Sequence, residues 1–151
     1  MALPPPVPES TCLVTGASSG IGAEIARELA RRGYGVTLVA RREERLRELA
    51  AELERAHGIR AEIVAASVSD REGRSGLVEE IEGRGLTVEV LVNNAGFGSG
   101  GRFQKQDPEG EEEMVRTNVE AVVGLCGAYA AKMITRELHA GEVSLVRPAE
   151  A

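Results

Sequence analysis

Short apolar segments alternate with segments of helical periodicity along almost the whole chain. The apolar segments predict buried strands over residues 11–15, 36–40, 59–66, 88–92 and 142–146. Between them, apolar residues recur every three or four positions, which predicts helices over residues 20–32, 42–57, 70–82 and 107–136. This alternation predicts an α/β fold: a doubly wound parallel sheet of order 3-2-1-4-5, with helices on both faces in three layers.

Individual side chains indicate where the predicted helices begin and which way they face. Asp70 is well placed to cap the third helix, and Asp107-Pro108 opens the fourth, with the proline at a first-turn position. In the first helix, Ile21, Ile25 and Leu29 fall at positions i, i+4 and i+8. They share one face, so we expect all three to point into the core.

A glycine-rich turn lies between the first predicted strand and the first predicted helix. The sequence from Thr15 to Gly22 has the spacing Gly-x-x-x-Gly-x-Gly. Glycines there allow a tight turn and close approach of the backbone to a bound group, and the start of the helix favours an anion. The turn is a candidate site for the pyrophosphate of a dinucleotide, although glycines also serve ordinary turns.

Composition narrows the classes of protein that the chain can belong to. The chain has 151 residues, a net charge of −6 and 42% apolar residues, which fits one globular domain. We expect a flexible proline-rich leader over residues 1–10 and a dinucleotide-binding domain over residues 11–151. The sequence has no basic face, secretory signal or membrane-spanning apolar run, so we expect a cytoplasmic protein without nucleic-acid or membrane partners.

The cysteines and histidines give no pattern of metal ligands. Cys12 and Cys126 lie in apolar surroundings far apart in the sequence, and His57 and His139 stand alone. We expect two buried free thiols and two histidines at the surface, with no disulfide and no metal site.

The loop after the fourth predicted strand reads Asn93-Asn94-Ala95-Gly96. In the predicted sheet the first and fourth strands are neighbours, so this loop and the glycine-rich turn meet where ligands of doubly wound sheets bind. Together the two segments resemble the short-chain dehydrogenase/reductase family, and the similarity extends roughly over residues 11–146. The resemblance implies a Rossmann fold, a nicotinamide dinucleotide and hydride transfer between a carbonyl and an alcohol.

The resemblance also implies roles for individual residues. It places the pyrophosphate and the adenosine ribose against Gly16, Ser18, Ser19, Gly20, Ile21 and Gly22. It places Asn93, Ala95 and Gly96 along the cofactor, and the Asn93 amide is also suited to tie strand ends together. Asn118 matches the helix asparagine that helps to hold a water near the catalytic lysine of the family, and it is equally suited to a local hydrogen bond.

The end of the second predicted strand decides between NAD and NADP. An acidic residue there would bind both ribose hydroxyls and repel a 2′-phosphate, but this chain has Ala40 followed by Arg41 and Arg42. Guanidinium groups bind phosphate through paired hydrogen bonds, so NADP is favoured over NAD. At the end of the third strand, Ser67-Val68 replaces the Asp-Val of the family, which is expected to weaken contacts with the adenine.

The catalytic serine, tyrosine and lysine of the family have no counterparts at the family's spacing. Tyr129 and Lys132 are three residues apart rather than four, and Ser144 lies inside the predicted fifth strand. We therefore expect a truncated oxidoreductase that keeps the cofactor site. A non-catalytic dinucleotide-binding or interaction module is the alternative, and another Rossmann enzyme such as a methyltransferase is more distant. An open edge at the fifth strand would favour self-association or aggregation.

Overall fold

The computed structural model describes residue 3 and residues 5–140. It contains a parallel four-stranded sheet of order β3-β2-β1-β4. The strands are β1 (Ser10–Thr15), β2 (Val36–Ala40), β3 (Ala61–Ala65) and β4 (Thr87–Val92). The predicted α/β fold and the order of its first four strands are confirmed, whereas the fifth predicted strand, at residues 142–146, lies outside the described residues.

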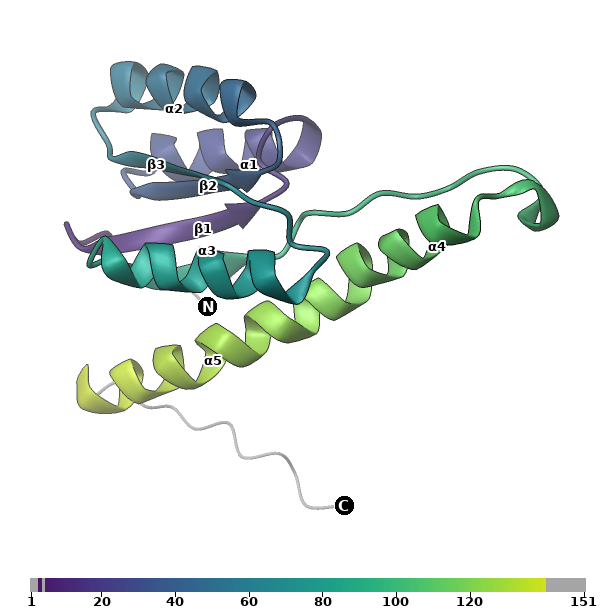
Figure 1. Cartoon of the computed structure of the whole chain (residues 1–151). Helices are drawn as coiled ribbons and strands as arrows, with labels where there is room; N and C mark the ends of the chain where they lie inside the picture. The colour runs from purple at the N-terminus through teal and green to yellow at the C-terminus, as the bar shows by residue number, and fades with distance from the viewer. Residues whose placement is uncertain (1–2, 4, 141–151) are drawn as a thin grey trace.

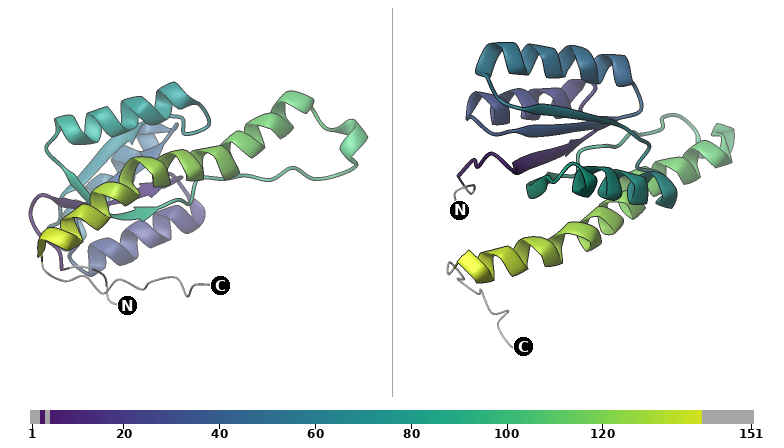
Figure 2. Two further views of the ribbon diagram at one scale, coloured as in Figure 1. Left: turned by 90° about the horizontal axis from the view of Figure 1, so that it is seen from below. Right: turned by 60° about the vertical axis from the view of Figure 1, so that its left-hand side comes forward.

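Helices cover both faces of the sheet (Figures 1 and 2). They are α1 (Gly20–Arg31), α2 (Glu43–His57), α3 (Arg71–Gly83), α4 (Pro108–Val115) and α5 (Ala121–Ala140). A 3-10 turn, η1 (Phe103–Lys105), precedes α4, and a π-helical turn, η2 (Arg116–Glu120), joins α4 to α5. α1 and α2 lie against one face of the sheet, and α3 and α5 lie against the other.

The predicted apolar face of α1 meets the core at two of its three positions. Leu29 is buried and Ile25 packs against the core partly buried, as expected, but Ile21 is 73% exposed. The side of α1 against the sheet carries Gly22, Ala23 and Ala26, all of them buried. Such small residues let the start of the helix approach the sheet closely, so the larger Ile21 is turned outward.

Aspartates cap α3 and α4 at the predicted starts of these helices. Asp70 accepts a hydrogen bond from the Gly73 N–H at 2.6 Å at the start of α3. Asp107 accepts one from the Gly110 N–H at 3.2 Å at the start of α4. Each carboxylate satisfies a donor that the helix itself leaves unpaired. The caps therefore fix the residues at which α3 and α4 begin.

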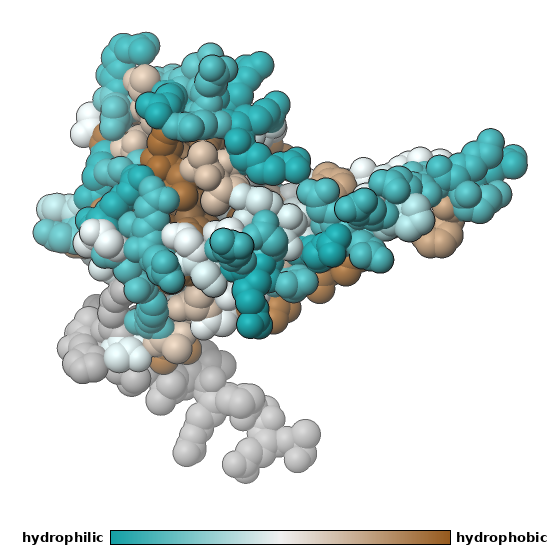
Figure 3. All heavy atoms as spheres, in the orientation of Figure 1, coloured by the Kyte–Doolittle hydropathy of each residue, from teal (hydrophilic) through white to brown (hydrophobic). Residues whose placement is uncertain are grey.

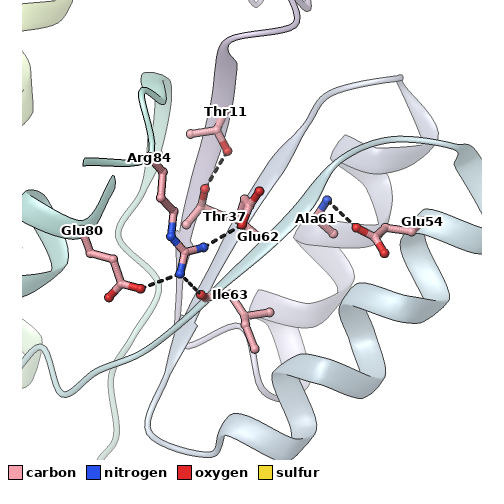
Figure 4. Close-up of polar contacts among 8 residues, drawn as sticks. All are labelled: Thr11, Thr37, Glu54, Ala61, Glu62, Ile63, Glu80 and Arg84. Atoms are coloured by element: carbon pink, nitrogen blue, oxygen red, sulfur yellow. Dashed lines mark hydrogen bonds and ion pairs between the residues drawn. The ribbon is translucent and has the colours of Figure 1, made fainter. Parts of the chain in front are cut away.

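Side chains cover the outer edge of β3, an edge strand of the sheet (Figure 4). Arg84 donates to the Glu62 carboxylate at 2.6 Å and to the Ile63 carbonyl oxygen at 3.2 Å. The Glu54 carboxylate, from α2, accepts from the Ala61 N–H at 3.3 Å. Because unpaired strand edges recruit other chains, these contacts protect the β3 edge against pairing with another strand.

The loop after β4 and helix α4 extend away from the sheet (Figures 1 and 2). Val115 of α4, Val119 of η2 and Val123 of α5 are exposed at four-residue spacing, and Figure 3 shows apolar residues along the lower side of the projecting part. Within the described residues, no helix combines the length and apolarity needed to cross a lipid bilayer.

Candidate functional site

A cleft of about 270 Å³ opens at the carboxyl ends of the strands. It is lined by Gly16, Ser18, Ser19, Val39, Ala40, Arg41, Arg42, Ala66, Ser67, Val68, Ser69, Ala95, Gly96, Phe97, Glu113 and Thr117. The two loops that the sequence placed near each other therefore share one cleft. We call residues 16–22 the glycine wall, and residues 93–97 together with Asn118 the amide wall.

Close backbone contacts shape the glycine wall. Gly16 has a φ of 67°, and a Cβ added there would lie 2.8 Å from the Cα of Ala95. A Cβ added at Gly22 would lie 2.5 Å from the Gly16 carbonyl oxygen and 2.5 Å from the Asn94 side-chain nitrogen. Both positions exclude any side chain, so the turn can pack against the amide wall only with glycine at each.

The glycine wall also presents the start of α1 to the cleft. Ser19 is the N-cap residue, and within the described residues its side chain caps no N–H of the helix. Gly20, with a φ of 59°, has open space where a Cβ would stand. Gly20, Ile21 and Gly22 belong to the first turn, whose N–H groups have no acceptor within the helix. An anion is the natural acceptor there, because the helix dipole favours it.

Hydrogen bonds to Thr15 hold the amide wall against β1. The Thr15 hydroxyl accepts from the N–H groups of Asn94 and Ala95, both at 3.0 Å, and donates to the Val92 carbonyl oxygen at 3.3 Å. The Asn94 side-chain amide donates to the Thr15 carbonyl oxygen at 3.0 Å. The residue that ties the strand ends is therefore Asn94 and not Asn93.

Asn93 points elsewhere, because successive residues of an extended segment face opposite sides. Its side-chain nitrogen lies 3.4 Å from the sulfur of Cys126 on α5. Cys126 is exposed, which corrects the expectation of two buried thiols. Cys12 is buried as expected, and burial, with a smaller effect of Glu89, raises the pKa of its thiol to about 12.

Asn118 joins the rest of the amide wall to η2. Its Oδ1 accepts from the Phe97 N–H at 3.1 Å, and its Nδ2 donates to the Phe97 carbonyl oxygen at 2.8 Å. The paired bonds fix the loop beside Gly96, whose added Cβ would lie 2.9 Å from the Asn118 Oδ1. Asn118 therefore positions the loop at Phe97, independently of any role in holding a water.

The two arginines at the end of β2 enter the cleft differently. One Arg42 nitrogen donates to the hydroxyls of Ser18 and Ser19, at 3.1 and 2.9 Å. One Arg41 nitrogen lies 3.2 Å from a carboxylate oxygen of Glu113 on α4. Arg42 therefore converges on the glycine wall, whereas Arg41 reaches across to the helix on the opposite side.

The segment after β3 closes the remaining side of the cleft. The Ser67 and Ser69 hydroxyls share a hydrogen bond of 2.8 Å. The carbonyl oxygen of buried Val68 accepts from Arg74 at 2.8 Å, and Arg74 also forms an ion pair with Glu120 of η2. Buried Arg74 therefore links this side of the cleft to the turn that carries Asn118.

Most of the site residues that the sequence singled out line the cleft, namely Gly16, Ser18, Ser19, Arg41, Arg42, Ser67, Val68, Ala95 and Gly96. Five others are not among the lining residues, namely Gly20, Ile21, Gly22, Asn93 and Asn118. Sequence reasoning missed Glu113 and Thr117. Their four-residue spacing puts them on one helix face, but spacing alone does not say what that face meets.

Tyr129 and Lys132 lie on α5, outside the residues that line the cleft. Tyr129 is 3% exposed, and burial, with a smaller effect of Glu82, raises the pKa of its hydroxyl to about 12. Lys132 forms an ion pair with Glu82 of α3. Both residues therefore belong to the packing between α3 and α5.

Comparisons with known proteins agree with this geometry. A family model described as short chain dehydrogenase matches residues 10–146. A very-long-chain 3-oxoacyl-CoA reductase from Mycosarcoma maydis is 35% identical over 133 residues, which cover 85% of this chain and 37% of the relative. The structure of L-sorbose reductase from Gluconobacter frateurii, complexed with NADPH and L-sorbose, is 34% identical with a TM-score of 0.79, covering 87% of this chain and 50% of that one.

A third similar protein is an alcohol dehydrogenase from the archaeon Thermococcus sibiricus, complexed with 5-hydroxy-NADP. It is 34% identical with a TM-score of 0.78, and the match covers 84% of this chain and 54% of that one. The chain thus spans about half the length, or less, of these proteins. Because the family model takes in the sheet and both walls of the cleft, this chain belongs to the short-chain dehydrogenase family.

Proposed function

We propose that this chain supplies the NADP(H)-binding part of an oxidoreductase that transfers hydride between a carbonyl and an alcohol. The observation that carries the proposal is a single cleft that joins the glycine wall, the amide wall and both arginines of the β2 end. Family membership supports the type of reaction. The two similar structures that are complexed with NADPH and with 5-hydroxy-NADP support the choice of cofactor.

The residues of the cleft fit a dinucleotide with a 2′-phosphate. The uncapped start of α1 suits the pyrophosphate, and Arg42 with its two serine partners adds donors beside it. Ala40 puts no carboxylate at the end of β2, and Arg41 presents a guanidinium that is 70% exposed. Ser67 and Val68 would flank the adenine, and the amide wall would flank the nicotinamide half. The bound cofactor would supply the hydride, while these residues hold and orient it.

The preference for NADP is tested by replacing Arg41. We expect wild-type protein to bind NADPH more tightly than NADH and Arg41→Asp to reverse the order. Loss of a charge-assisted phosphate contact weakens binding by about 1.5–3 kcal/mol, roughly 10- to 150-fold. Titration followed by nucleotide fluorescence measures both affinities. Arg45→Asp is the matched control, because Arg45 lies on α2 outside the cleft lining. Equal affinities in the wild type would contradict the proposal.

The 151-residue polypeptide by itself is proposed to bind cofactor without reducing carbonyls. Reduction needs a proton donor of suitable pKa within about 3 Å of the forming alkoxide. Tyr129 is buried away from the cleft lining with a raised pKa, and Lys132 is paired with Glu82. Ser144 lies outside the described residues. The assay is NADPH consumption with reactive ketones and quinones, and turnover that is lost in Tyr129→Phe would show this assignment to be wrong.

A non-catalytic dinucleotide-binding or interaction module is the second candidate, favoured by the packing role of Tyr129 and Lys132. Sequencing the gene beyond the codon for Ala151 separates the two. A continuation that encodes Tyr-x-x-x-Lys supports the oxidoreductase, and its absence supports the module.

Self-association is also proposed, since Val115, Val119 and Val123 are exposed in one stripe. A monomer by light scattering at high concentration would count against it.

A further inference from the structure

The ion pair between Arg41 and Glu113 crosses the cleft. Arg41 follows β2 and Glu113 belongs to α4, 72 residues later, yet one guanidinium nitrogen and one carboxylate oxygen lie 3.2 Å apart. Both side chains line the cleft, together with Thr117 one helical turn after Glu113. The guanidinium that would bind a 2′-phosphate thus already has an anionic partner within the protein.

We propose that Glu113 is a specificity-determining residue that competes with the 2′-phosphate for Arg41 and so lowers the preference of the cleft for NADP over NAD. This inference rests on the proposed function. A carboxylate and a phosphate use the same guanidinium N–H groups. A phosphate that reaches Arg41 must displace Glu113 or share the guanidinium with it, and the two anions repel each other.

The surroundings identify Glu113, among the acidic residues of α4, as the competitor. A carboxylate oxygen of Glu112 lies 3.7 Å from a guanidinium nitrogen of Arg116, four residues later, and Glu112 is absent from the cleft lining. Arg42 is not the target, because it donates to the serine hydroxyls of the glycine wall. The Asp107 cap sets the start of α4 and thereby the helical position from which Glu113 faces Arg41.

The effect is expected to be moderate, because the pair is open to solvent. Arg41 and Glu113 are 70% and 40% exposed, and exposed ion pairs are weak and are screened by salt. Removing the Glu113 charge should tighten the binding of a 2′-phosphorylated nucleotide by about 3- to 10-fold at low salt. It should leave a nucleotide without that phosphate within about twofold of the wild type.

A double-mutant cycle with matched nucleotides tests the competition. Wild type, Glu113→Gln, Arg41→Ala and the double variant are titrated with NADPH and NADH by fluorescence. Calorimetry with adenosine 2′,5′-bisphosphate and AMP repeats the comparison with probes that need no nicotinamide subsite. We expect Glu113→Gln to tighten NADPH and the bisphosphate only, and the gain to disappear when Arg41 is alanine. Glu112→Gln is the control and should change neither affinity.

Each result of these titrations either supports or overturns the competition between Glu113 and the 2′-phosphate. Unchanged selectivity in Glu113→Gln, with both nucleotides still bound, would overturn the competition and leave the proposed function standing. A gain that persists without Arg41 would also overturn it, since the effect would then be general charge repulsion. If folded wild-type protein, checked by circular dichroism, binds none of the four nucleotides, the proposed function fails and the inference fails with it.

Discussion

The glycine wall and the amide wall face each other across one cleft but are held by different interactions. In the glycine wall, Gly16 and Gly22 leave no room for a Cβ, so contacts of the backbone set the shape. In the amide wall, Thr15, Asn94 and Asn118 hold a loop through hydrogen bonds between side chains and backbone groups. A substitution that adds side-chain atoms should therefore disrupt the glycine wall, whereas one that removes a hydrogen-bond donor or acceptor should disrupt the amide wall.

The two cysteines give the largest expected contrast, because one is buried in the strand that leads to the glycine wall and the other is exposed beside Asn93 of the amide wall. Cys12, on β1, is buried and has its thiol pKa raised to about 12 by burial, whereas Cys126 is exposed beside Asn93. Since the thiolate is the reactive form, we expect Cys126 to react with an aromatic disulfide at pH 8 at least about 10³-fold faster. Stopped-flow absorbance would resolve the phases. Cys126→Ser should abolish only the fast one, and two fast phases would contradict the buried position of Cys12.

Among the stability variants compared across the two walls, Gly22→Ala should have the largest effect. Its methyl group would lie 2.5 Å from the Gly16 carbonyl oxygen, and such overpacking destabilises by about 3 kcal/mol. Gly76→Ala, in α3, is the matched control because nothing lies within 4 Å of its added Cβ. That change should stabilise by about 0.5–1 kcal/mol through helix propensity. Urea unfolding measures both, and similar values for the two variants would refute the backbone contact as the cause.

Arg74→Met tests the connection from the amide-wall side of the cleft to the segment after β3. It removes the donor to the Val68 carbonyl and the partner of Glu120. Breaking a fully buried pair costs 3–5 kcal/mol, and because Glu120 is 54% exposed we expect about 2 kcal/mol. Glu120→Gln should cost less than about 1 kcal/mol. The free energy of unfolding gives the comparison, and an equal loss in both variants would show that the hydrogen bond to the Val68 carbonyl, which Glu120→Gln leaves in place, adds nothing to stability.

Asn118→Ala should have the smallest effect of the series, since it removes two hydrogen bonds to Phe97 at an exposed position. We expect a loss of about 1–2 kcal/mol. Asn93→Ala is the control, because its contact with the Cys126 sulfur is long and weak, and it should lie within about 0.5 kcal/mol of the wild type. Thermal unfolding by circular dichroism would rank the pair, and a larger loss for Asn93→Ala would reverse our assignment of the supporting amide.

Most of the fold could be predicted from the sequence because each element carries a local signal. The β2 segment was predicted with its observed bounds, Asp70 caps α3 as expected, and α4 begins at Asp107-Pro108 as expected. The position of Ile21 could not be predicted in the same way. Periodicity detects the stripe of Ile21, Ile25 and Leu29, and the last two pack in the core, but at the start of α1 it is Gly22, with no side chain, that lies against the sheet.

The residues of the candidate site likewise divide into those that a local sequence pattern identifies and those that only the three-dimensional structure brings together. The glycine wall was predictable because the glycines that shape it, Gly16 and Gly22, stand close together in the sequence between a predicted strand and a predicted helix. The contacts of Asn94 with Thr15 and of Arg41 with Glu113 join residues more than 70 positions apart. Which of two adjacent asparagines faces inward, and which of several glutamates meets an arginine, depends on strand and helix orientation in three dimensions. No local pattern records that orientation.

The π-turn η2 sets the rotational phase between two stretches of one long helix. A π-turn holds one residue more than an α-helical turn, which offsets the residues before it by about 100° relative to those after it. Ahead of η2, Glu113 faces the cleft, and after it Leu125 and Tyr129 face the core. Deleting a single codon within residues 116–120 would leave the core stripe of α5 intact and bring a different residue of α4 opposite Arg41. Cofactor preference in this chain could therefore change by a shift in helical register, with every side chain at the end of β2 left as it is.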